Sequence, residues 1–259
     1  MGSHLRDLPH PLNLFEFVTG SHHYHLGLRP CADEELGSSM DRLLDVHLPR
    51  LRPAGRVLDV GCGMGGAVAL FAARGFRAVG IDPCAGAVRY SRAVLPEGAE
   101  VELSQARLED FEGAPVDAVF LTEVLQHFRD LDRVLARCRA LLAPGGAVVV
   151  NDPVLHEPVS RERVPYHPAG ALVAAAERFG FDIERDDDLT PDVVETLPRM
   201  RGEIERRRGE LSAFFAARPR VDEEIDELLS HLAHFERGFA DGYVSYRATV
   251  LRRPEQLRA

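Results

Sequence analysis

A glycine-rich segment with two nearby acidic residues is the part of this sequence best suited to bind a nucleoside. The glycines at positions 61, 63, 65 and 66 follow the apolar run 57–60, and a helix-forming stretch comes directly after them. Glycine at such a turn lets the backbone pass close to a ligand, and it directs the first N–H groups of the helix toward that ligand. Asp82 ends the next apolar run, about 20 positions on, where a carboxylate can accept both hydroxyls of a ribose.

Asp59 bears on which nucleoside this would be. The glycines fit the dinucleotide fingerprint G-x-G-x-x-G, and together with Asp59 they also fit the pattern D-x-G-x-G-x-G. A carboxylate two residues before the first glycine repels a pyrophosphate and attracts the ammonium group of a methionine moiety. The sequence therefore favours a methionine-bearing nucleoside, with an NAD-dependent oxidoreductase as the weaker alternative.

Histidine supplies the candidate base. His127 follows the fourth predicted strand, and an imidazole, with an ordinary pKa near ~6.5, can accept a proton at neutral pH. Packing at the start of a helix is the alternative role for His127. We predict His127 as the catalytic residue and His25, His127, His156 and Tyr243 as the residues that contact the acceptor.

The N-terminal arm, residues 1–28, is rich in histidine and aromatic residues. His22, His23 and His25 raise the question of a metal, but adjacent histidines rarely converge on one ion and no nearby carboxylate supplies an obvious third ligand. We therefore predict no metal site. The apolar positions have no long helical period, which predicts a short helix or an ordered arm rather than a core element. We expect this arm, with Tyr24 and His25, to close over the cofactor as a lid.

These residues need a scaffold, and residues 56–152 supply one by alternating strand-like and helical stretches. Predicted strands cover residues 56–60, 76–81, 100–103, 116–121 and 147–151. Continuous apolar strands between helices predict a parallel sheet covered on both faces. Ligands bind beyond the carboxyl ends of such strands. Asp82, the loop 104–111, the segment 122–128 and residues 151–152 should therefore share one rim.

Four segments resemble the successive motifs of class I S-adenosylmethionine-dependent methyltransferases in order and spacing. They are VLDVGCGMG at 57–65, GID at 80–82, VFLTEVLQHF at 119–128 and LLAPGG at 141–146. The resemblance implies a Rossmann-like, seven-stranded, doubly wound α/β sheet with an antiparallel last strand, S-adenosylmethionine as cofactor and S-adenosylhomocysteine as product. It also implies that Asp82 holds the ribose, Gly61 and Gly63 admit the methionine portion, and Thr122 lies beside the sulfonium. The full predicted cofactor set is Tyr24, Asp59, Gly61, Gly63, Asp82, Pro83, Arg107, Leu108, Glu109 and Thr122.

The remaining sequence predicts a helical cap on the acceptor side. Residues 194–215 and 221–239 have helical periodicity, broken at 218–220, and residues 242–251 alternate like a half-buried strand. We divide the chain into an N-terminal arm and helix (1–50, the lid), the cofactor-binding core (51–190), the helical cap (191–240) and the closing strand (241–259). Residues 24–27, 188–190 and 242–246 have a looser similarity to small-molecule methyltransferases of bacterial specialised metabolism, which include antibiotic-biosynthesis enzymes.

Composition limits the partners. The net charge is −10, which argues against non-specific nucleic-acid binding, and all 31 basic residues are arginine. No membrane-length apolar run and no signal peptide are found, and four scattered cysteines suit a reducing cytoplasm. Methyl transfer to a small molecule, at O, N or C, is the leading interpretation. Two alternatives are a metal-assisted C-methyltransferase acting on an α-keto acid or enolate, and a non-catalytic regulator that binds S-adenosylmethionine. The oligomeric state is left open, a homodimer included.

Overall fold

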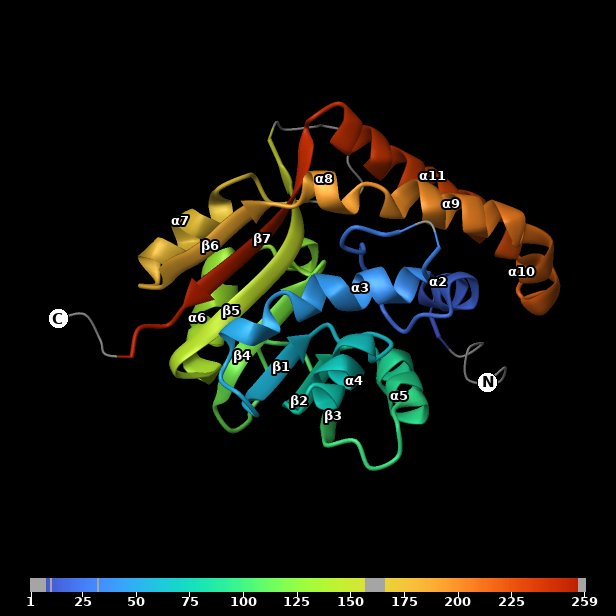
Figure 1. Ribbon diagram of the computed structural model, residues 1–259. Helices are drawn as coiled ribbons and strands as arrows, with labels where there is room; N and C mark the ends of the chain where they lie inside the picture. Colours follow the sequence, from blue (N-terminus) through green and yellow to red (C-terminus); the bar gives the residue numbers. More distant parts are fainter. Residues whose placement is uncertain (1–7, 10, 32, 157–165, 256–259) are drawn as a thin grey trace.

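The computed structural model describes residues 8–9, 11–31, 33–156 and 166–255 (Figure 1). Its centre is a seven-stranded sheet in the order β3-β2-β1-β4-β5-β7-β6. The strands are β1 Arg56–Val60, β2 Arg77–Asp82, β3 Val101–Gln105, β4 Val116–Thr122, β5 Leu142–Leu155, β6 Asp182–Asp188 and β7 Val244–Arg252. Neighbours among β1 to β5 pair in parallel, whereas β7 is antiparallel to both β5 and β6. The predicted fold class is confirmed.

Helices cover both faces of the sheet because its central strands carry apolar side chains on both sides. On one face, Leu44, Val68 and Phe71 from α3 (Leu36–Asp45) and α4 (Gly66–Ala73) pack with Phe120 and Val149 of the sheet. On the other face, α6 (Leu131–Leu141) and α7 (Ala171–Arg178) pack against the alternate strand positions. Helix α5 is Ala85–Val94 and the 3₁₀ turns are Leu48–Arg50 and Leu125–His127.

The cap contains three longer helices where the sequence predicted two. They are α9 (Thr196–Arg206), α10 (Arg208–Phe214) and α11 (Val221–Ala240), preceded by α8 (Thr190–Val193). The unpredicted break falls at Arg207, whose guanidinium donates to the carbonyl oxygens of Phe17 and Val18 and lies 4.5 Å from the Phe17 ring centroid. A contact with the N-terminal arm therefore accompanies the break, and local periodicity could not reveal it.

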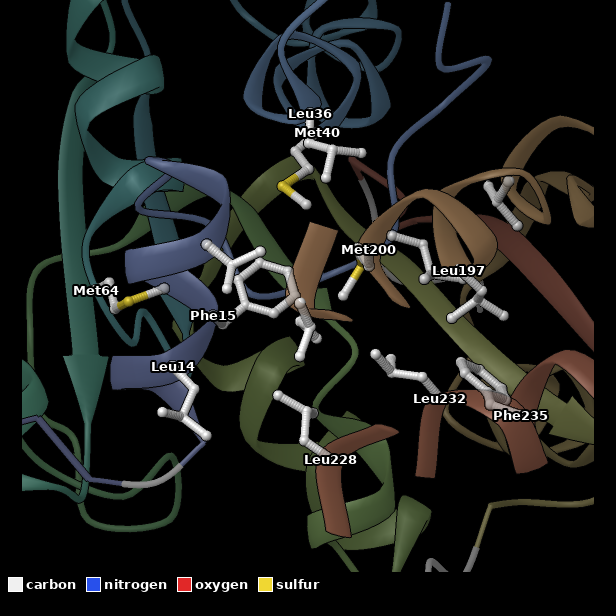
Figure 2. Close-up of a cluster of buried hydrophobic side chains, with 14 of the residues drawn as sticks. Leu14, Phe15, Leu36, Met40, Met64, Leu197, Met200, Leu228, Leu232 and Phe235 are labelled. Atoms are coloured by element: carbon white, nitrogen blue, oxygen red, sulfur yellow. The ribbon is translucent and has the colours of Figure 1, made fainter. Parts of the chain in front are cut away.

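The arm contains the short helix α2 (Leu12–Thr19), one of the two expected forms, but the expectation that it is not a core element was wrong. Leu14 and Phe15 are almost completely buried, and they belong to the cluster that joins arm, cap and glycine-rich turn. Figure 2 shows Phe15, Met64 and Met200 converging on this cluster. The reason is tertiary, because α2 is only eight residues long and its apolar side chains are buried in a cluster shared with the distant cap, which no local pattern reveals. In Figure 1, α2 lies beneath α9 and beside α10.

Within the described residues, no helix is long and apolar enough to cross a membrane.

Candidate active site

A cavity of about 540 Å³ opens between the carboxyl ends of the central strands, the N-terminal arm and the cap. Its size falls in the usual range for small-molecule sites. The strand register brings Val60, Ile81 and Leu121 side by side, so the loops that follow β1, β2 and β4 meet at one rim. From the opposite side, α2 contributes Leu12 and Phe15, and the cap contributes Leu197, Met200, His231, Leu232 and Phe235.

The glycine-rich turn forms one wall of the cavity. Gly61 and Gly63 have φ angles of 76° and 49°, a region that side chains with a Cβ atom rarely adopt. A Cβ on Gly61 would also lie 3.0 Å from the Val124 Cγ2 atom. Glycine adopts both conformations without strain, and at Gly61 the contact with Val124 also leaves little room for a side chain.

Two carboxyl groups, Asp82 and Asp59, line the cavity at this wall, and they differ in burial and in hydrogen bonding. Asp82 accepts hydrogen bonds from the Gly63 N–H (3.0 Å) and the Cys84 N–H (2.7 Å), which fix its side chain at the rim. Asp59 is buried, and no hydrogen bond to its side chain is found in the described part of the chain. Burial, with a smaller contribution from the Asp82 charge, raises the pKa of Asp59 to about 7. A buried carboxylate of this kind is an incomplete site for a cation.

The helix N–H groups expected to face the ligand are partly engaged by the protein. The Gly66 N–H, at the start of α4, donates to the His22 carbonyl oxygen (3.1 Å), and the Gly63 N–H is bound by Asp82. A Cβ on Gly66 would meet the His22 oxygen at 2.7 Å, so glycine permits the arm to dock. Because these donors already face a carbonyl oxygen and a carboxylate, the turn does not offer them to a pyrophosphate.

A chain of hydrogen bonds holds the histidines of the arm. His25 Nδ1 lies 2.8 Å from the Leu26 carbonyl oxygen, His25 Nε2 lies 3.1 Å from His23 Nδ1, and His23 Nε2 lies 2.7 Å from Asp41. The carbonyl can only accept, so His25 donates through Nδ1 and accepts from His23 through Nε2. The chain ends at the Asp41 carboxylate, which faces His23 Nε2. Burial, chiefly, lowers the pKa of His25 to about 3, which agrees with a neutral ring.

Glu123 joins the arm to the closing strand inside the cavity wall. Its Oε1 accepts hydrogen bonds from the Leu26 N–H (2.7 Å) and the Tyr246 hydroxyl (2.9 Å). The Glu123 backbone has a φ of 51°, which is uncommon for a residue with a side chain. Burial raises the pKa of this carboxyl to about 7. Glu123 is not among the residues predicted from the sequence, although its place directly after β4, at the carboxyl end of a strand, is a signal that points to it.

The structure brings most of the predicted site residues together. All ten predicted cofactor residues line this one cavity, and so do His25 and His127. His127 ends the 3₁₀ turn after β4 and is exposed toward the solvent side.

Two predicted acceptor residues do not line this cavity. His156 lines a separate hollow of about 260 Å³ on the other side of β5, and its Nε2 lies 2.8 Å from the Ser245 hydroxyl. Tyr243 lies near Gly238 of α11, where a Cβ on that glycine would be 3.3 Å from its ring. Their places depend on how β7 pairs with β5, which sequence spacing does not reveal. Among the residues that the structure describes, no group of three or more metal-ligating side chains is found.

The strand order, the glycine-rich turn and the Asp59–Asp82 pair define a class I S-adenosylmethionine-dependent methyltransferase. Residues 32–185 match a family model described as a methyltransferase domain, and the chain belongs to that family.

Relatives and solved structures extend the similarity over most of the chain. A dimethylglycine N-methyltransferase of Parasynechococcus marenigrum (strain WH8102) is 29% identical over 93% of this chain and 91% of its own length. A trans-aconitate 2-methyltransferase of Methylobacterium nodulans is 33% identical over 82% and 86%. The structure of a cyclopropane synthase from Mycobacterium tuberculosis superposes with a TM-score of 0.78 at 17% identity, covering 95% and 99% of the two chains.

Proposed function

We propose that this protein transfers the methyl group of S-adenosylmethionine to a nucleophilic atom of a small molecule held between the sheet rim and the cap. The observation that carries the proposal is Asp59, a buried carboxylate beside the glycine-rich turn with no protein partner among the described residues. An ammonium group would complete this site, whereas a phosphate would not. The looser similarity of residues 24–27 and 242–246 supports an acceptor from specialised metabolism.

The residues present fit this cofactor. Asp59 would take the ammonium of the methionine moiety, and Asp82, with its position fixed by two backbone donors, keeps free lone pairs for the ribose hydroxyls. Pro83 and Leu108 offer apolar surface at the end of the cavity where adenine is expected. Thr122 lies at the carboxyl end of β4 and lines the same cavity.

The cofactor supplies an electrophilic methyl group, and the reaction is a single in-line displacement. The chain's contribution is then to align the acceptor, to exclude water and to remove a proton where the acceptor carries one. Apolar side chains of α2, α9 and α11 line the acceptor side of the cavity. We propose His127 as the proton acceptor, because it lines the cavity and ends the 3₁₀ turn that follows β4.

Titration calorimetry followed by product detection tests the proposal. The protein should bind S-adenosylmethionine and S-adenosylhomocysteine but not NAD, and it should release S-adenosylhomocysteine with a suitable acceptor. Asp82→Ala should weaken binding about 10–100-fold, as expected when a hydrogen-bonded carboxylate is removed.

The matched control is Asp45→Ala, since Asp45 forms an exposed ion pair with Arg74; this variant should bind like the wild type. Unchanged affinity in Asp82→Ala would contradict the ribose assignment. Binding without S-adenosylhomocysteine release over a panel of O, N and C nucleophiles would instead support a non-catalytic binding protein.

A further inference from the structure

We propose that the acceptor is an apolar amine that lacks an anionic group, and that the Glu123 carboxylate binds its ammonium group. This inference rests on the proposed methyl transfer and specifies the substrate class of the same site. It rests on the charged and aromatic side chains that line the cavity between the strand rim and the cap.

The first observation is that one carboxyl oxygen of Glu123 has no hydrogen-bond partner among the described residues. Oε1 accepts from two donors, the Leu26 N–H and the Tyr246 hydroxyl, and no partner of Oε2 is found among the described residues. Both of these donors are neutral, and no ion pair to Glu123 occurs in the part of the chain that the structure describes. A cation inside the cavity would therefore be the charge partner that Glu123 lacks.

The second observation is the aromatic surface on the same side. Tyr24 packs edge-on against Phe15 with ring centroids 4.9 Å apart, and Tyr166 stacks on Phe235 at 5.7 Å. All four rings line the cavity. Aromatic faces attract cations, and with Leu197, Met200 and Leu232 they also provide apolar surface for the substituents of an amine.

The third observation is the position of the positive side chains. The chain has no lysine, and Arg107 is the one arginine in the described lining of the cavity. Arg107 follows β3, which is three strands away from β4 in the sheet, or about 14 Å at the usual strand spacing. It therefore lies toward the predicted adenine end, away from Glu123. Two relatives are named for dimethylglycine and trans-aconitate, and both of these molecules carry carboxylates. In this cavity such a carboxylate would face the carboxylate of Glu123, which would repel it.

The proton and electron balance is simple for a primary amine. The bound ammonium gives one proton to His127, and the freed nitrogen lone pair forms the new N–C bond. The C–S bond breaks with its electron pair on sulfur, which yields a neutral thioether and a methylated ammonium. The positive charge on nitrogen returns at the end of the step, so Glu123 faces a cation before and after transfer.

Three probes of nearly equal shape test the charge preference. They are 2-phenylethylamine, 2-phenylethanol and 3-phenylpropanoate, each titrated by saturation-transfer NMR into protein saturated with S-adenosylhomocysteine. We expect the amine to bind about 10–100-fold more tightly than the alcohol, and the carboxylate to bind most weakly. Equal binding of amine and alcohol, tighter binding of the carboxylate, or no detectable binding of the amine would overturn the proposal.

Two variants separate charge from structure. Glu123→Gln keeps an oxygen that can accept from Leu26 and Tyr246, so it should remain folded, bind S-adenosylhomocysteine normally and lose the preference for the amine. Glu184 lies on β6 and forms an ion pair at the surface with Arg252 of β7. Glu184→Gln removes the same charge there and should keep the preference. If Glu123→Gln keeps the preference as well, or loses cofactor affinity in parallel with amine affinity, Glu123 acts only as a structural link. Absence of S-adenosylhomocysteine binding in the wild type would instead reject the proposed function itself.

Discussion

At the scale of single residues, the unusual feature of the site is that Asp59 and Glu123 are carboxyls whose pKa values burial raises to about 7. A carboxyl in this range holds its proton until a cation makes the charged form favourable. Cofactor binding should therefore be linked to proton release at Asp59.

The raised pKa of Asp59 determines the direction in which cofactor affinity changes with pH. Below pH 7, Asp59 is mostly protonated in the free protein and must lose its proton when the ligand ammonium binds. Affinity for S-adenosylhomocysteine should thus rise with pH, by up to about tenfold per unit between pH 5 and 7, and level off above pH 8. Calorimetry in buffers of different ionisation enthalpy would detect the released proton. Asp59→Asn should remove most of this dependence; an unchanged slope in that variant would place the titrating group elsewhere.

The second prediction for a single residue is that His127 acts as the general base. His127→Ala should lower turnover about 10²–10⁴-fold while affinity for S-adenosylmethionine stays nearly constant, because a general base acts on the chemical step. His156→Ala is the matched control, since His156 lines the other hollow, and its turnover should stay close to wild type. Reduced thermal stability with normal turnover in His127→Ala would show that the ring packs rather than reacts.

At the scale of elements, the N-terminal arm is tied into the fold at several points. The Gly66 N–H donates to the His22 carbonyl oxygen, and the Glu123 carboxyl accepts from the Leu26 N–H. The Gly27 backbone makes two hydrogen bonds with Thr196 of α9. Each contact joins the arm to a different element, so the arm couples the core to the cap. This arrangement differs from a loose lid, because Leu14 and Phe15 anchor α2 in the shared apolar cluster.

Thr196 offers a direct test of that coupling. Its buried hydroxyl accepts from the Gly27 N–H and donates to the Gly27 carbonyl oxygen, both at 3.0 Å. Thr196→Val keeps the shape but leaves both Gly27 groups without a partner, at a cost of about 1–3 kcal/mol for each buried group. We expect a lower melting temperature and faster amide hydrogen exchange in residues 21–28. Exchange confined to α9 would mean that the arm is held by other contacts.

At the scale of the whole molecule, the buried titratable groups predict how stability depends on pH. Asp59, Glu123 and Asp152 have raised pKa values because they are buried, so the native state holds their protons when the unfolded chain has released them. For Asp59 and Glu123, whose pKa values are raised to about 7, stability therefore falls as pH rises through 7. His25 and His47 are buried with pKa values lowered to about 3 and about 4, so they favour the native state increasingly up to about pH 6.5 and contribute no further change above it.

Below pH 6.5, the carboxyls and the histidines change the free energy of unfolding in opposite directions. Above pH 6.5, only the carboxyls change it. The free energy of unfolding should therefore decrease between pH 6.5 and pH 8, which urea titrations at the two values would measure. Glu123→Gln should reduce this decrease and be more stable than the wild type at pH 8. A wild-type stability that increases over the same interval would show that these carboxyls are not protonated in the native state.

The sequence by itself determined the parts of this protein that depend on near neighbours. The strands of the parallel core, the glycine-rich turn and the position of Asp82 at a strand end follow from apolar runs and from backbone conformations only glycine accepts easily. These depend on a few consecutive residues, so a linear pattern contains them, and all ten predicted cofactor residues indeed line one cavity.

Which residues line the acceptor side of the cavity was decided only by the tertiary structure. Glu123 meets Leu26 and Tyr246, which lie 97 and 123 positions away, and His156 is carried out of the cavity by the pairing of β5 with β7. Likewise, α2 is a core element only because the cap, chiefly α9 and the end of α10, packs on it. Such contacts depend on how distant elements pack, and packing depends on shape across the whole molecule rather than on the spacing of neighbouring residues.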